Sequence, residues 1–135
     1  MEKIFVDTSG WVALFVKKDI NHKKAGNIFE ELKSSKAVIY TSDYVIDETI
    51  TTISVRGNHK QSLIAGKAFF DSKIIKNIYV APEYLEPAWK LCQKYKDKKF
   101  SFTDVTSFVI ITNFGIKRVF SFDRDFQQAG INVIC

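Results

Sequence analysis

Short apolar runs alternate along the chain with longer segments in which apolar residues recur every three or four positions. Runs of the first kind predict strands, and segments of the second kind predict amphipathic helices. The predicted strands cover residues 3–7, 37–41, 78–81, 117–122 and 131–134. The predicted helices cover residues 9–19, 22–34, 42–57 and 59–73, a segment that begins at Pro82 or Pro87 and runs to about Lys96, and a segment after Thr103, with a short turn or helix over 123–130.

Small polar residues mark several of the predicted helix ends. Thr8 or Ser9 is expected to cap the first helix, Ser42 the third and Thr103 the last long one, because short oxygen-bearing side chains accept hydrogen bonds from the free N–H groups there. Gly57 is a usual place for a helix to stop. The helix after Thr103 is apolar round nearly its whole circumference, which predicts that it lies in the interior.

Strands separated by helical segments of a dozen or more residues favour right-handed crossovers and a parallel sheet. Helices then cover both faces, so the predicted fold class is α/β, a three-layer α/β/α sandwich. The chain has 135 residues, the usual size of one domain, and shows neither a repeat nor a linker. A single domain over residues 1–135 is therefore expected.

Composition excludes several classes of protein. The apolar N-terminus is interrupted by Glu2, Lys3 and Asp7, so it has neither the basic start of a signal peptide nor the length of a membrane span, and a cytoplasmic protein is expected. Cys92 and Cys135 stand alone, without a CxxC pair or a histidine at metal-ligand spacing. Neither a disulfide framework nor a zinc site is predicted.

The net charge of +5 favours a polyanionic partner without establishing one. Arg56 and the basic stretches 17–24 and 94–99 are candidates for contacts with a nucleic-acid backbone. Lysines on helix exteriors are equally typical of a solvated surface, so charge alone leaves both readings open.

Acidic residues fall where a parallel α/β sheet would bring them together. Asp7 ends the first predicted strand, Asp123 ends the strand over 117–122, and Asp104 lies at the start of the interior helix. The carboxyl ends of parallel strands and the starts of the helices that follow them share one edge of the sheet. Glu48 lies about six residues, roughly 9 Å, into its helix and could reach this edge, although Asp47 flanks the apolar face almost equally.

Each acid also has an ordinary structural reading when it is taken alone. Asp104 suits a helix dipole, Asp123 and Asp125 suit a turn, and Asp7 suits a helix cap. Several carboxylates at close range repel one another, however, and a cation is their natural partner. A ligand set made only of oxygen atoms favours Mg²⁺ or Mn²⁺, ions that also bind phosphate and support phosphodiester chemistry.

Four motifs, in this order and at these separations, resemble the PIN domain nucleases and among them the VapC-like toxins of toxin–antitoxin pairs: "FVDTSGW", "TSDYVIDET", "FTDVTSF" and "SFDRDF". The resemblance spans essentially the whole chain and implies a five-stranded parallel sheet of order 3-2-1-4-5. It assigns an acidic quartet of metal ligands to Asp7, Glu48, Asp104 and Asp123, with Asp7 and Asp104 as the principal ligands, and it prefers Glu48 to Asp47. It implies two further roles: Ser9 orients a water, a ligand or a phosphate, and Asp125 is an auxiliary ligand.

The same resemblance implies a function and partners. The expected activity is hydrolysis of RNA phosphodiester bonds by water, supported by Mg²⁺ or Mn²⁺, with no role for His22 or His59 as acid or base. The expected partners are the RNA substrate, a VapB-like antitoxin bound in a groove near Trp11 and Phe15, and a second copy in a homodimer, although core packing is the ordinary role of these two aromatic residues.

Two other classes of protein are considered. One is a non-catalytic RNA-binding or scaffolding PIN domain. The other is a phosphohydrolase that forms an aspartyl phosphate, a class that usually has a second acid where this chain has Ser9.

Overall fold

The computed structural model describes residues 1–135 and contains one sheet of five parallel strands in the order β3-β2-β1-β4-β5. The strands are β1 (Lys3–Val6), β2 (Val38–Ser42), β3 (Ile75–Ile78), β4 (Arg118–Phe120) and β5 (Asn132–Ile134). The helices are α1 (Thr8–Phe15), α2 (His22–Ser34), α3 (Asp43–Arg56), α4 (His59–Asp71), α5 (Pro82–Lys94), α6 (Phe102–Asn113) and α7 (Asp125–Gln128). The predicted α/β class, parallel pairing and strand order are confirmed.

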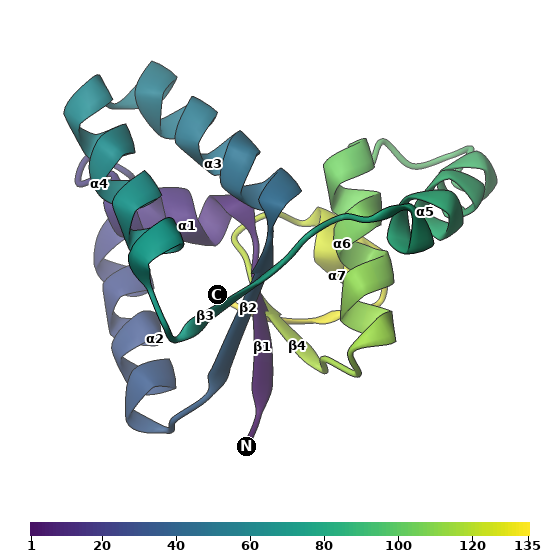
Figure 1. The fold of residues 1–135 in the computed structure, drawn as a ribbon, viewed down its shortest axis with the longest axis horizontal. Coiled ribbons are helices and arrows are strands. Elements are labelled where there is room, and N and C mark those ends of the chain that lie inside the picture. Colours follow the sequence, from purple (N-terminus) through teal and green to yellow (C-terminus); the bar gives the residue numbers. More distant parts are fainter.

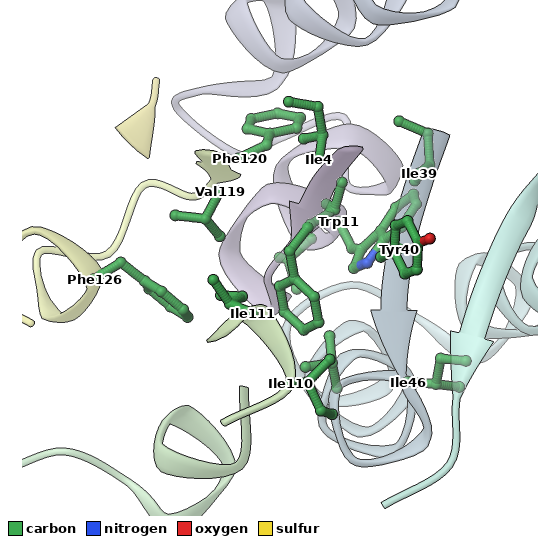
Figure 2. Packing of buried hydrophobic residues seen from close by; sticks show 14 of the residues in the cluster. Ile4, Trp11, Ile39, Tyr40, Ile46, Ile110, Ile111, Val119, Phe120 and Phe126 are labelled. Carbon is green, nitrogen blue, oxygen red and sulfur yellow. The ribbon is translucent and has the colours of Figure 1, made fainter. Parts of the chain in front are cut away.

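The helices form two groups with the sheet between them. In Figure 1, α1 to α4 lie to the left of the sheet and α5 to α7 to its right. A core of 27 buried apolar residues joins the layers, and Figure 2 shows it gathered round the central strands, with Trp11 from α1, Ile110 from α6 and Phe126 from α7. Most of α6 is buried, as predicted for an interior helix. No helix has the length and apolar character that crossing a membrane requires.

The first helix differs from its predicted limits at both ends. Asp7, rather than Thr8 or Ser9, occupies the N-cap position, yet its carboxylate makes no capping hydrogen bond. The helix stops at Phe15 instead of residue 19, because the backbone turns at Val16 and Asp19, where Asp19 N–H donates to Val16 O. Asp19 therefore lies in the α1–α2 loop.

The third strand was predicted over 78–81, and this prediction is wrong by three residues. Val80 N–H donates to the Asp43 carboxylate at 2.8 Å, a tertiary contact that takes this backbone out of the sheet. Ala81 then holds the N-cap position of α5, and Pro82 is its first residue. The structure thus selects Pro82 over Pro87 as the start, in keeping with the preference of proline for the first turn.

Helix α6 begins two residues earlier than a Thr103 cap would allow. Ser101 is the N-cap: its Oγ accepts from Asp104 N–H at 3.0 Å, and the Asp104 carboxylate accepts from Ser101 N–H at 3.3 Å. Strand β4 ends at Phe120 rather than residue 122, so Asp123 lies in the following loop. Ser42 caps α3 as predicted, with its Oγ accepting from Val45 N–H at 3.1 Å.

A close approach between α1 and β4 requires glycine at position 10. A Cβ there would lie 2.9 Å from the backbone oxygen of Phe120 and 3.2 Å from a methyl group of Val6. Gly10→Ala is therefore expected to lower the free energy of unfolding by about 1–3 kcal/mol, measured by urea titration. Gly26→Ala, in α2 with nothing near its Cβ, is the control and should raise it by about 0.5–1 kcal/mol. Equal effects of the two changes would contradict this explanation.

Candidate metal centre and active-site cleft

A cleft of about 470 Å³ lies at the carboxyl edge of the sheet, between α1 and α3 on one side and the start of α6 on the other. Its lining includes all six residues that the sequence analysis predicts to form the site: Asp7, Ser9, Glu48, Asp104, Asp123 and Asp125. Strands β1 and β4 are neighbours, and Asp7 N–H donates to Phe120 O at 3.1 Å. Asp7 thus stands at the topological switch point, where open parallel sheets bind their ligands.

Asp7 is a buried carboxylate with one oxygen satisfied and one free. The residue is 2% exposed; Oδ2 accepts from Ser121 Oγ at 3.0 Å and from Ser9 Oγ at 3.3 Å, whereas Oδ1 has no hydrogen-bond partner. Burial raises the pKa of Asp7 to about 6, and the negative charges of Glu48 and Asp123 act in the same direction. A buried carboxylate oxygen without a donor is costly and suits a cation ligand.

Two serines hold the β1 and β4 ends together. Ser9 Oγ and Ser121 Oγ are 3.0 Å apart. Phe122 N–H donates to Ser9 Oγ at 2.8 Å, and Asp123 N–H donates to Ser121 Oγ at 3.0 Å. The pair therefore fixes Asp7 Oδ2 and the loop that carries Asp123 in one hydrogen-bonded unit.

Asp104, Asp123 and Asp125 form the tightest group of carboxylates, with one oxygen from each lying within 4.8 Å of the others. Asp104 is 5% exposed, and its pKa is raised to about 8, chiefly by burial. A hydrogen bond with Asp125 contributes to this shift, as do the charges of Asp7, Asp125 and Asp123. Asp125 N–H donates to Asp123 Oδ1 at 3.0 Å, which links the two acids on the loop.

Glu48 faces this cleft and Asp47 does not. The side chain of Glu48 is half-buried and accepts a hydrogen bond from Thr8 Oγ1, whereas Asp47 is exposed and outside the lining. The geometry therefore resolves the ambiguity that helical periodicity left between the two acids. Glu48 and Asp7 line the same cleft without belonging to the 4.8 Å group of Asp104, Asp123 and Asp125.

The donor set fits a hard divalent cation. Every ionisable ligand in the group is a carboxylate, and neither histidine nor cysteine lines the cleft. A cation would supply a partner for the free Oδ1 of Asp7, and it would favour the charged form of Asp104, whose pKa is raised by burial and by the neighbouring acids. Oxygen donors of this kind suit Mg²⁺ or Mn²⁺ rather than zinc.

The family model of the PIN domain matches residues 4–132 of the chain. The chain belongs to the PIN domain family. This PIN domain is 34% identical over 127 residues to the 23S rRNA-specific endonuclease VapC20 of Mycobacterium tuberculosis, covering 94% of both chains. The crystal structure of VapC20, described as a sarcin–ricin loop cleaving toxin, matches with a TM-score of 0.85 at 34% identity and 95% coverage of each chain.

More distant structures share the fold of this PIN domain. VapBC2 of Rickettsia felis, bound to a DNA fragment from its promoter, matches with a TM-score of 0.73 at 13% identity, covering 98% of this chain and 97% of the other. FitAcB of Neisseria gonorrhoeae matches with a TM-score of 0.71 at 13% identity, covering 98% and 96%. At this identity the likeness concerns the fold alone.

Sequence reasoning missed several residues that line or support the cleft of this PIN domain. The pattern predicts a strand at Ser121 and a helix at Asp19, but both residues lie in loops. Asp19 lines the cleft, and Ser121 donates a hydrogen bond to Asp7. Thr52 was missed as well, and it follows Glu48 by four residues and precedes Arg56 by four. Residues four apart lie on one face of a helix, so this spacing could have identified Thr52 from the sequence.

Proposed function

We propose that this PIN domain is a Mg²⁺- or Mn²⁺-dependent endoribonuclease and the toxin of a VapBC-type toxin–antitoxin pair. The observation that carries the proposal is the convergence of buried carboxylates, one with a free oxygen, in an open cleft. The name and 34% identity of the VapC20 relative support RNA as the substrate. The net charge of +5 favours the same substrate class.

Asp104, Asp123 and Asp125 would hold the ion, with Asp7 Oδ1 and Glu48 completing the acidic lining. A bound Mg²⁺ or Mn²⁺ supplies a Lewis acid that lowers the pKa of water and offsets charge on phosphate oxygens. Ser9 and Ser121 fix the other oxygen of Asp7 and so set the orientation of its carboxylate. The protein thereby contributes a preorganised set of oxygen donors.

Water is the proposed nucleophile, because the cleft offers no side chain for covalent catalysis by cysteine or proton transfer by histidine. His22 lies 2.8 Å from the backbone oxygen of Ala13 through Nδ1, and His59 is exposed at the start of α4. Attack by water on phosphorus that breaks the bond to the ribose 3′-oxygen leaves a 5′-phosphate and a 3′-hydroxyl. Attack by the ribose 2′-hydroxyl would instead leave a 2′,3′-cyclic phosphate.

The proposed antitoxin site is an apolar groove of about 560 Å³ between α1, α2 and α4. Phe15, Phe29 and Ile64 line it, together with Trp11, which is 1% exposed and packs against Phe69 with ring centroids 5.0 Å apart. Trp11 therefore serves mainly as core, and the partly exposed residues offer the contact surface. The groove suits the apolar face of an amphipathic helix.

The test is cleavage of total RNA by the purified protein after treatment with a chelator. Cleavage is expected only when Mg²⁺ or Mn²⁺ is restored, and the fragments should accept adapters that require 5′-phosphate and 3′-hydroxyl ends. Equal cleavage in the chelator, or fragments that end in 2′,3′-cyclic phosphate, would overturn the proposed reaction.

A further inference from the structure

One face of α3 forms a polar row along the cleft. Glu48, Thr52 and Arg56 all line the cleft at intervals of four residues. Since an α-helix rises 1.5 Å per residue, Arg56 lies about 12 Å along the axis from Glu48. Figure 1 shows α3 running away from the carboxyl edge of the sheet, so Arg56 flanks the carboxylate cluster at a distance.

Arg56 is loosely held. Its Nη2 lies 3.3 Å from Asp19 Oδ2, and the two side chains are 55% and 11% exposed. Asp19 is fixed by its own loop, because its Oδ1 accepts from Asn21 N–H at 2.8 Å. A guanidinium has five N–H donors, and only this one contact is made, so most of them face solvent. A single contact from an arginine that is more than half exposed adds little to stability, which makes a purely structural role for Arg56 weak.

The charge of the cleft makes a flanking cation useful. Six carboxylates line it, against the two cations Arg56 and Lys99, which come from opposite walls. The phosphates of a nucleic-acid strand that lie within about a Debye length of these acids are repelled, and a metal ion bound among the acids acts most strongly on the phosphate it contacts. A guanidinium fork matches phosphate geometry in two parallel hydrogen bonds.

We propose that Arg56 binds a phosphate of the substrate strand other than the one that is cleaved, and that this phosphate takes the place of Asp19 as its partner. The inference rests on the proposed function, which supplies RNA as the substrate, and it identifies Arg56 as a residue that aligns the RNA strand in the cleft. Asp19 holds the guanidinium in place in the free protein and competes with the phosphate for it. Arg56 is thus a substrate-binding residue outside the carboxylate cluster.

The experiment measures binding of a fluorescein-labelled RNA hairpin carrying the sarcin–ricin loop, by anisotropy, in an Asp7→Asn background that prevents cleavage. Arg56→Ala is expected to weaken binding about tenfold, typical of a charged hydrogen bond. The slope of log affinity against log salt should fall by about 0.7, as for one phosphate contact on a single strand. Arg56→Lys should recover part of the affinity, because it keeps the charge without the fork.

In the protein with Asp7 restored, Arg56→Ala should raise KM more than it lowers kcat.

Arg118→Ala is the matched control. Arg118 is likewise a partly exposed arginine that pairs with a carboxylate, Glu2 at 2.6 Å, but it begins β4 at the opposite edge of the sheet. This variant should leave affinity and salt slope unchanged. Asp19→Asn should tighten binding two- to threefold, and the gain should shrink in the Arg56→Ala background.

Unchanged affinity or salt slope in Arg56→Ala would overturn the inference, as would an equal loss in Arg118→Ala. The proposed function is tested by a different result. If the wild type cut no RNA with Mn²⁺ while Arg56→Ala still lost affinity, the nuclease proposal would be rejected and the contact between Arg56 and phosphate would be retained.

Discussion

Asp7→Asn is expected to lower RNA cleavage in saturating Mn²⁺ by about a thousandfold, the loss typical of removing a charged group from the centre of an electrostatic site. The substitution keeps the size of the side chain. One amide oxygen can still accept from Ser121 and Ser9, so the serine unit that ties β1 to β4 remains. What is lost is the negative charge beside the oxygen that has no partner in the protein.

The matched control for this variant is Asp47→Asn, which makes the same chemical change on the exposed side of α3. Its cleavage rate should stay within about twofold of the wild type, as expected for a surface substitution outside the cleft. Initial rates on total RNA and far-ultraviolet circular dichroism of all three proteins provide the comparison. A folded Asp7→Asn protein that cleaves at the wild-type rate would reject the site.

The convergence of the acids could be predicted because it follows from topology rather than from exact element ends. Asp123 lies three residues beyond the end of β4, and Asp104 lies in the third position of its helix, yet both still reach the same edge of the sheet. Parallel strands and crossover helices bring these segments together even when a boundary shifts by two residues. Strand order came from the resemblance and is confirmed.

The features that could not be predicted depend on tertiary contacts. The displacement of β3 depends on the bond from Val80 N–H to Asp43, which lies 37 residues away in the chain. Helical periodicity leaves Glu48 and Asp47 nearly equivalent, and the preference for Glu48 came from the resemblance; its contact with Thr8 at the start of α1 depends on tertiary structure. The role of Ser121 as a partner of Asp7 required the pairing of β1 with β4 to be known.

The metal-free protein is expected to lose stability as pH rises from about 4 to about 8. The pKa of Asp7 is raised to about 6 and that of Asp104 to about 8, against an ordinary 3.8. Between these values the folded chain binds more protons than the unfolded chain, so the free energy of unfolding falls as pH increases. For Asp7 alone, a shift of about two pH units corresponds to about 3 kcal/mol.

Asp104→Asn isolates this effect, because it removes the larger of the two shifts. An Asn side chain can still accept from Ser101 N–H and complete the cap of α6. In chelator near pH 8 the variant should be more stable than the wild type by about 2 kcal/mol or more, and the difference should nearly close near pH 4, close to the ordinary pKa of an aspartate. Urea titrations at the two pH values measure it, and a difference that does not depend on pH would contradict the assignment.

Added Mn²⁺ should reverse the order of the two proteins. A divalent ion binds the deprotonated carboxylates, so its affinity rises over the same pH range in which the metal-free wild type loses stability. The ion stabilises only the folded state that binds it, so Mn²⁺ should raise the melting temperature of the wild type more at about pH 8 than at about pH 6. Asp104→Asn should show little response at either pH, because it lacks one of the three carboxylates that lie within 4.8 Å of one another. The burial and mutual repulsion of the carboxylates, which weaken the fold at neutral pH, are therefore the same properties that make the cleft selective for a cation.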